Sequence, residues 1–197
     1  WEMGLEYDEI PEKDPLRHSI IRQAWQRKIN APQSTSVGRL FDAATALAGL
    51  RTVASYEGQG PAEFEALAEM AAGEFSEYIQ PDIETHDKLL IVNWKSLISA
   101  MLDSTLSAAA KALLFHSSLA QNILQQAKLI RQKHAVNTVS LSGGVFQNRV
   151  LSEHALALLS ENDFEVCLPE LIPVNDAGIS FGQVMEYGLK NKLEKVI

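Results

Sequence analysis

The residues best suited to chemistry lie in two glycine-containing turns near the C-terminal end of the sequence. The first turn belongs to Leu141–Arg149, LSGGVFQNR, and the second to Pro173–Gly182, PVNDAGISFG. Because glycine lacks a Cβ atom, backbone N–H groups at Ser142, Gly143 and Gly144 can approach an anion closely, and a following helix adds its positive end. The first turn therefore predicts a phosphate-binding site.

Polar side chains in the same two turns extend this candidate site. Asn148 is predicted to lie one turn into the helix, where its amide can donate to a ligand oxygen, and the second turn carries Asn175 and Asp176. The Asp176 carboxylate suits a hard metal ion. Aspartate is also a preferred N-cap, and Gly178 can simply permit close packing. Spacing alone leaves both interpretations of Asp176 open.

Other reactive side chains show no catalytic arrangement. Neither a Ser–His–Asp arrangement nor a Cys–His arrangement is apparent. Cys167, the only cysteine, is expected to be a small buried thiol at the end of a strand. No two histidines are three or four residues apart, which excludes a two-histidine metal site on one helix of this chain. The five histidines are His18, His86, His116, His134 and His154.

Alternating strand and helix patterns are expected to position the two turns. Strands are predicted over Thr138–Leu141 and Phe164–Leu168, with helices over Gln147–Glu161 and Asp176–Lys192. A strand, helix, strand crossover of this length should be parallel and right-handed. Both turns would then lie at the carboxyl edge of one sheet, where open α/β sheets bind ligands.

The first two thirds of the chain are predicted to be mainly helical, because apolar residues recur at three- and four-residue steps. The expected elements are a lead-in over Trp1–Asp14, helices over Leu16–Ile29, Val37–Leu47, Pro61–Ala72 and Thr105–Lys133, and a hairpin of Tyr78–Ile83 with Lys88–Asn93.

Several polar residues in these helices have ordinary structural interpretations. Asp42 is expected on a solvated face or linked to Arg39, and Glu63 and Glu65 in a first helical turn, where acids favour the helix dipole. His116, beside an apolar stripe, is expected to be a hydrogen-bonded core residue. Periodicity by itself therefore assigns none of these side chains to a site.

Composition and charge describe an ordinary globular chain. Its 197 residues are enough for one domain, or one domain with a helical annex. A net charge of −8 argues against a nucleic-acid partner. The longest apolar runs, near Leu40–Leu50 and Leu89–Trp94, are far shorter than the roughly 18 residues of a membrane span. We find no signal peptide, and a single cysteine fits a reducing cytosol, so a cytoplasmic protein without membrane contact is expected.

Five ordered sequence blocks resemble the C-terminal carbamoyltransferase region of the hydrogenase maturation protein HypF. This resemblance implies a helix-rich α/β fold, as a partial actin-like, RNase H-like (ASKHA, Kae1-type) lobe with a small sheet. It also implies a lead-in and helix over residues 1–35 and an incomplete C-terminal lobe over 36–197. Because the chain begins at Trp1, we expect an excised piece of a longer protein. The blocks are Ser36–Leu50, Tyr56–Ala68, Leu113–Ile123, Leu141–Leu151 and Pro173–Gln183.

The resemblance further implies an enzyme and its substrates. In that family carbamoyl phosphate and ATP form carbamoyl adenylate, and the carbamoyl group passes to the C-terminal cysteine of the partner protein HypE. The resulting thiocarboxamide is dehydrated to the cyanide ligand of the nickel–iron hydrogenase centre. A divalent metal, Mg or Fe, is also implied, with its paired-histidine ligands in a first lobe upstream of Trp1.

Individual residues match the family's functional positions. Gly143, Gly144 and Asn148 match the motif that contacts nucleotide, together with Ser142 beside them, and Asp176 matches the aspartate that binds metal. In a less regular match, Asp42 with Glu65 or Glu63 corresponds to acids near the ribose. His116 matches a family histidine to which no role is assigned. The usual NDGG-like and YEGQAA-like segments read NDAG and YEGQGP here, and neither change removes a chemical group.

Two alternative functions remain open at this point. A tRNA threonylcarbamoyl transferase would share the fold, although the FQN after SGGV and the GRLFD block argue against it. The chain could also be a nucleotide-binding or docking module without chemistry. If one lobe of a two-lobed cleft is missing, the chain is expected to fold but to bind ATP weakly and transfer nothing.

Overall fold

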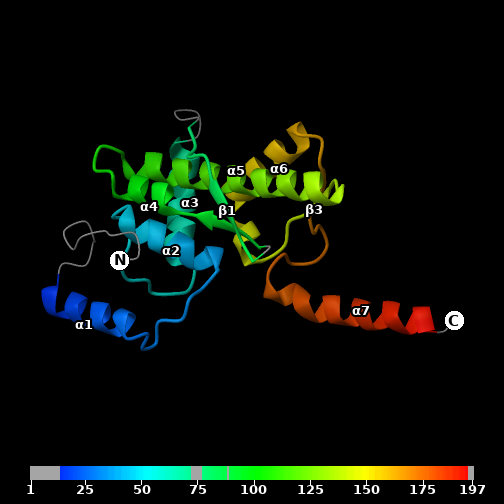
Figure 1. The fold of residues 1–197 in the computed structure, drawn as a ribbon, viewed down its shortest axis with the longest axis horizontal. Coiled ribbons are helices and arrows are strands. Elements are labelled where there is room, and N and C mark those ends of the chain that lie inside the picture. The colour runs from blue at the N-terminus through cyan, green and yellow to red at the C-terminus, as the bar shows by residue number, and fades with distance from the viewer. Residues whose placement is uncertain (1–13, 72–76, 88, 195–197) are drawn as a thin grey trace. The chain divides into compact units, whose positions relative to one another are not determined.

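The structure is a computed structural model that describes residues 14–71, 77–87 and 89–194. It forms two compact units, and the division falls inside the long helix α5, after Asn122. Apart from Asp14, the predicted lead-in lies outside the described residues. The elements of the first unit are α1 (Pro15–Gln26), α2 (Val37–Leu47), α3 (Gln59–Ala71), β1 (Asp82–His86), β2 (Leu89–Asn93), α4 (Lys95–Leu102) and the first part of α5 (Ala108–His134) (Figure 1).

Helix α2 shows how local sequence sets an element. Ser36 is its N-cap and accepts a hydrogen bond from the Arg39 N–H at 3.4 Å. Gly49, with a φ of 79°, follows the helix and permits the chain to turn away. The predicted bounds of this helix are confirmed. Helix α1 instead ends at Gln26 rather than at Ile29, since Lys28 adopts a φ of 55°.

The core of the first unit is an aromatic cluster contributed by helices α2, α3 and α5. The Phe41 and Phe115 rings pack edge to face with centroids 4.9 Å apart, and Phe64 lies 5.7 Å from Phe115. All three rings are buried. Burial of each such ring contributes roughly 1.5–3 kcal/mol, so this cluster is the main apolar anchor for α2 and α3.

A hairpin follows α3 in the first unit. Strands β1 and β2 pair antiparallel, with Asp82 opposite Asn93 and His86 opposite Leu89. The predicted hairpin is confirmed, although β1 spans Asp82–His86 and not Tyr78–Ile83.

The second unit contains the predicted strand, helix, strand pattern. Val139 of β3 pairs with Val166 of β4 in a parallel ladder, which confirms the predicted direction. Leu151, Ala155 and Leu159 of α6 are buried, and α6 contacts β4. The elements are β3 (Thr138–Ser140), the 3-10 turn η2 (Gly144–Gln147), α6 (Arg149–Glu161), β4 (Glu165–Cys167), the 3-10 turn η3 (Asp176–Gly178) and α7 (Ile179–Glu194).

Arg131, near the end of α5, contacts residues that directly precede the strands of this small sheet. One terminal guanidinium nitrogen donates to the Asn137 side chain at 3.1 Å and to the Asn162 carbonyl at 2.9 Å. The guanidinium carbon lies 4.0 Å from the centroid of the Phe164 ring. The helix, the start of β3 and the turn before β4 are thereby held together.

The protein therefore has a helix-rich α/β fold with two small sheets, as predicted. Cys167 differs from expectation: it is exposed, because β4 is only three residues long and its last residue stands at the end of the strand. Among the described residues, no helix is both long enough and apolar enough to cross a membrane.

Candidate functional site

The first glycine-containing turn follows β3, and its residues 141–143 precede the 3-10 turn η2. Gly143 has a φ of 113°, a conformation that favours glycine, and its N–H donates to the Val174 carbonyl at 2.8 Å. Among the described residues, no backbone carbonyl accepts from the N–H of Ser142 or Gly144, and both residues are exposed. Two of the three predicted amides thus remain for an anion, while the third holds the turn in shape.

Asn148 occupies a different position from the predicted one. The turn η2 separates the glycines from α6, and Asn148 is the N-cap of that helix rather than a residue one turn inside it. Its side-chain oxygen accepts from the Leu151 N–H at 2.9 Å. The prediction failed because Gly144–Gln147 forms a 3-10 turn, so the α-helix begins at Arg149 and not at Gln147.

The second turn is capped by Asn175 and not by Asp176. The Asn175 side chain accepts from the Ala177 N–H at 3.1 Å, which leaves the cap role filled and the Asp176 side chain exposed. Gly178 packs so tightly that an added Cβ would lie 2.6 Å from the Pro173 carbonyl oxygen. The prediction that Gly178 permits close packing is confirmed, and the N-cap interpretation of Asp176 is wrong.

The two turns are neighbours within the second unit. The bond from Gly143 to Val174 joins them, and a Cβ on Gly144 would lie 3.9 Å from the Cβ of Asn175. Exposed amides in one turn therefore adjoin a turn that carries the exposed carboxylate of Asp176. This pairing suits an anionic ligand together with a hard cation.

A complete metal centre is not visible in the described part of the chain. No group of three or more His, Cys, Asp or Glu side chains comes close enough there to hold a metal ion. Asp176 fits the role of a single oxygen ligand by its chemistry and exposure. Any further ligands would have to come from elsewhere.

Asp42 lines an open cleft in the first unit. Its carboxylate lies 3.0 Å from the Arg39 guanidinium, so the predicted link to Arg39 is confirmed. The cleft has a volume of about 500 Å³ and is formed by α2, the start of α3 and the loop between them. Its lining residues are Arg39, Asp42, Thr45, Ala46, Arg51, Thr52, Ala54, Ser55, Tyr56, Glu57, Gly58 and Gly60.

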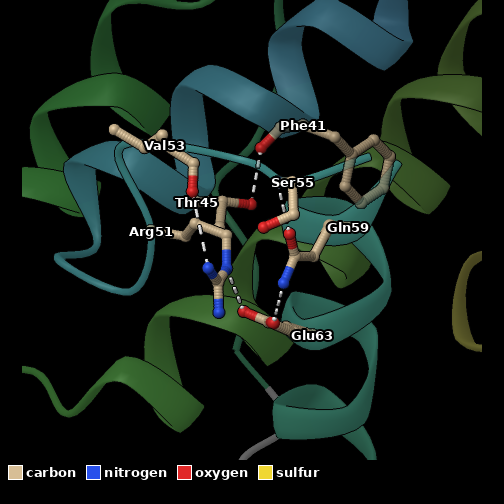
Figure 2. A network of polar contacts seen from close by, with 7 residues as sticks. All are labelled: Phe41, Thr45, Arg51, Val53, Ser55, Gln59 and Glu63. Atoms are coloured by element: carbon tan, nitrogen blue, oxygen red, sulfur yellow. Dashed lines mark hydrogen bonds and ion pairs between the residues drawn. The ribbon is translucent and has the colours of Figure 1, made fainter. Parts of the chain in front are cut away.

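Glu63 forms the centre of a polar network beside this cleft (Figure 2). One carboxylate oxygen accepts from Arg51 Nε at 2.6 Å, and the other accepts from Gln59 Nε2 at 3.0 Å. The hydrogen bond from Arg51 is the main cause that lowers the pKa of Glu63 below its usual value, and Gln59 adds to it. Helix α3 begins at Gln59, so Glu63 and Glu65 lie past its first turn, and the helix-dipole interpretation is wrong.

The remaining predicted residues lie apart from the cleft. Glu65 is half-buried on α3 and does not line it. His116 is fully buried, with its ring 5.1 Å from that of Phe41 and Nδ1 2.7 Å from the Ala112 carbonyl. The prediction of a hydrogen-bonded core histidine is confirmed.

Sequence reasoning missed Arg51 and Gln59. Arg51 pairs with Glu63 across twelve residues of loop and helix. For Gln59 a local signal existed, because it is four residues before Glu63 and the two would share one face of a helix. Using that signal required knowing that α3 starts at Gln59.

Comparison with known proteins identifies the family. The family described as "Carbamoyltransferase, Kae1-like Domain, second subdomain" matches residues 3–183. The carbamoyltransferase HypF of Rhizobium leguminosarum bv. viciae is 36% identical over 197 residues, which cover 93% of this chain and 24% of the relative. That of Synechocystis sp. is 33% identical over 171 residues, covering 86% and 21%.

Two crystal structures agree with this result. Full-length HypF in its phosphate- and nucleotide-bound form matches with a TM-score of 0.79 and 33% identity, over 87% of this chain and 22% of that one. HypF of T. kodakarensis matches with a TM-score of 0.74 at 22% identity, over 90% and 23%, and this similarity supports the fold alone. The chain thus spans less than a quarter of the length of these proteins, and it belongs to the Kae1-like carbamoyltransferase family, whose second subdomain it matches.

Proposed function

We propose that this chain supplies part of the nucleotide site of a HypF-type carbamoyltransferase. In the proposed reaction carbamoyl phosphate, ATP and water yield carbamoyl adenylate with release of phosphate and pyrophosphate. The carbamoyl group then passes to the C-terminal cysteine thiol of HypE, with release of AMP, for cyanide ligand synthesis. The observation that carries the proposal is the family match over residues 3–183. The phosphate- and nucleotide-bound state named for a relative at 33% identity supports it.

The two joined turns of the second unit are the proposed contact with ATP. The amides of Ser142 and Gly144 would meet phosphate oxygens, Gly143 would fix the turn, and Asn148 would start α6 beneath the ligand. Asp176 would be one ligand of a divalent cation, Mg or Fe, which would neutralise phosphate charge when bound. For the first unit we propose separately that an acid near a ribose is supplied by Asp42, with Glu63 or Glu65.

The chain alone is proposed to be inactive. It covers less than a quarter of each relative named above, so the transfer reaction is expected to need protein that these 197 residues do not supply. The relatives named are carbamoyltransferases, which favours this activity over tRNA threonylcarbamoyl transfer. A docking module without chemistry would show no transfer in any form of the protein.

An ATP titration of the 197-residue chain, followed by NMR amide shifts, tests the site. With Mg²⁺ present, weak binding is expected to shift the amides of Ser142 and Gly144, and Asp176→Asn should weaken it. Glu170→Gln, which changes another exposed acid ahead of the second turn, is the control and should bind like the wild type. Absence of shifts at Ser142 and Gly144 at millimolar ATP would contradict the site. Carbamoyl transfer to HypE by the 197 residues alone would contradict the proposed inactivity.

A further inference from the structure

We propose that Glu63 and Arg51 form a latch that positions the loop Thr52–Gly58 as one wall of the cleft in the first unit. Glu63 would then be a positioning residue, and Asp42 on the opposite wall an acid that meets the ligand. This inference rests on the proposed function for the nature of the ligand, ATP, but not for the latch itself.

Both oxygens of the Glu63 carboxylate already have partners. Oε2 accepts from Arg51 Nε at 2.6 Å, and Oε1 accepts from Gln59 Nε2 at 3.0 Å. A ligand hydroxyl at Glu63 would have to compete with a charged donor and an amide donor. A ligand would meet less competition at Asp42, because this carboxylate pairs with Arg39, whose side chain is 61% exposed.

The two partners of Glu63 connect its carboxylate to the start and the middle of the loop. A terminal nitrogen of Arg51 lies 3.4 Å from the Val53 carbonyl near the loop's start. The Gln59 side-chain oxygen accepts from the Ser55 N–H at 2.8 Å. Figure 2 shows Arg51 and Gln59 each in contact with Glu63 on one side and with a loop residue on the other. One carboxylate thus ties down a segment that has no helix or strand of its own.

The fastened loop supplies half of the cleft's lining. Six of its residues face the cleft, whereas Asp42, Thr45 and Ala46 come from α2. Gly60 at the start of α3 packs against Thr45, since a Cβ there would lie 3.3 Å from Thr45 Cγ2. The α2 wall is therefore fixed by helix packing, whereas the loop wall is held by the latch and by one exposed ion pair, Arg39 with Glu57 at 3.9 Å. Without the latch, the loop would have to become ordered when ATP binds, and this ordering would lower the affinity for ATP.

The sign of the change in ATP affinity on removal of Glu63 distinguishes a charge effect from the latch. Arg51 lines the cleft, and Glu63 balances its positive charge. If charge alone mattered, removing Glu63 would expose a cation and strengthen the binding of a polyphosphate. If the latch matters, the same change frees the loop and weakens binding.

Four variants of the 197-residue chain test the latch: Glu63→Ala, Glu63→Gln, Arg51→Ala and the double alanine variant. The first readout needs no ligand and is the hydrogen exchange rate of the Ser55 amide. Because Glu63→Ala removes the partner that positions Gln59, the acceptor of the Ser55 N–H, this rate is expected to rise about fivefold or more. Glu63→Gln keeps one acceptor and should be intermediate. Adding Arg51→Ala to Glu63→Ala should change little further, because the two act as one unit.

The second readout is the affinity for ATP with Mg²⁺, measured by NMR shifts. Glu63→Ala is expected to weaken it about three- to tenfold. Asp42→Asn should weaken it without altering Ser55 exchange. Glu69→Ala, an exposed acid later on α3, is the control and should alter neither.

Three results would overturn the proposal. They are unchanged Ser55 exchange in Glu63→Ala, unchanged or stronger ATP binding in that variant, and additive effects in the double variant. If the wild type binds no ATP, the proposed function fails, while Ser55 exchange still decides whether the latch exists.

Discussion

Gly178 lies so close to Pro173 that a Cβ on the glycine would stand 2.6 Å from the proline carbonyl oxygen. Gly178→Ala must therefore displace the second turn, and we expect it to lower the free energy of unfolding by about 1–3 kcal/mol. Gly182→Ala is the matched control, because nothing lies within 4 Å of its Cβ position and alanine favours the helix by roughly 0.5–1 kcal/mol. Urea unfolding of both variants measures the difference. Equal stability of Gly178→Ala and wild type would refute the packing argument.

The first turn offers a comparison between two adjacent glycines. Gly143→Ala places a side chain at a φ of 113° and is expected to cost about 1–3 kcal/mol of stability. Gly144→Ala should leave stability nearly unchanged, because its nearest neighbours would be 3.9 Å away. If the missing Cβ at Gly144 admits phosphate, that variant should nevertheless lose ATP binding. Thermal unfolding and an ATP titration separate the two effects, and intact ATP binding by Gly144→Ala would exclude close approach there.

Arg131 is expected to be a structural residue of the second unit. Arg131→Ala removes two hydrogen bonds and the contact with the Phe164 ring, and it should cost about 1–3 kcal/mol in denaturant unfolding. Arg131→Lys keeps the charge but lacks the planar guanidinium that lies over the Phe164 ring, so it should recover only part of the loss. Full recovery by lysine would mean that charge alone matters.

His116 is expected to be needed for stability and not for chemistry. Its ring is fully buried between the Phe41 and Phe64 rings, so His116→Ala should leave a cavity and cost about 2–4 kcal/mol. His134→Ala, at the exposed end of the same helix, should cost less than about 1 kcal/mol. Denaturant unfolding compares the two. A stable His116→Ala variant that has lost only ATP binding would contradict this assignment.

The Glu63 latch should make stability depend on pH in one direction. Because the pKa of Glu63 is lowered in the folded chain, the unfolded chain binds the proton more readily, and stability rises with pH. The contribution is complete above the ordinary glutamate pKa of about 4.3 and is lost as the pH falls through the folded value. The stability difference between wild type and Glu63→Gln should therefore shrink as the pH is lowered from 6 to 3, roughly. A constant difference over that range would contradict the pairing with Arg51.

Local signals in the sequence predicted most of the fold. The Ser36 cap and Gly49 stop set the bounds of α2, and the crossover rule gave the parallel pairing of β3 with β4. Errors arose where a contact overrode the local pattern. Asn175 displaced Asp176 as the cap, and a 3-10 turn delayed α6 until Asn148.

The candidate site was less accessible from the sequence than the fold. The turns could be found because glycine and aspartate mark them directly. The partnership of Arg51 with Glu63 depends on how an irregular loop folds back over α3, which no periodic pattern records. Exposure of Cys167 likewise depends on how short β4 is.

The bond that joins the two turns of the second unit consists only of main-chain atoms, the Gly143 N–H and the Val174 carbonyl. Apart from proline at Gly143, a side-chain replacement leaves both of its atoms in place, whereas a change in the length of either turn can separate them. During evolution the two turns should therefore tolerate substitutions more readily than insertions or deletions. A length change in one turn should survive only with a compensating change in the other, which a library of paired deletions would reveal.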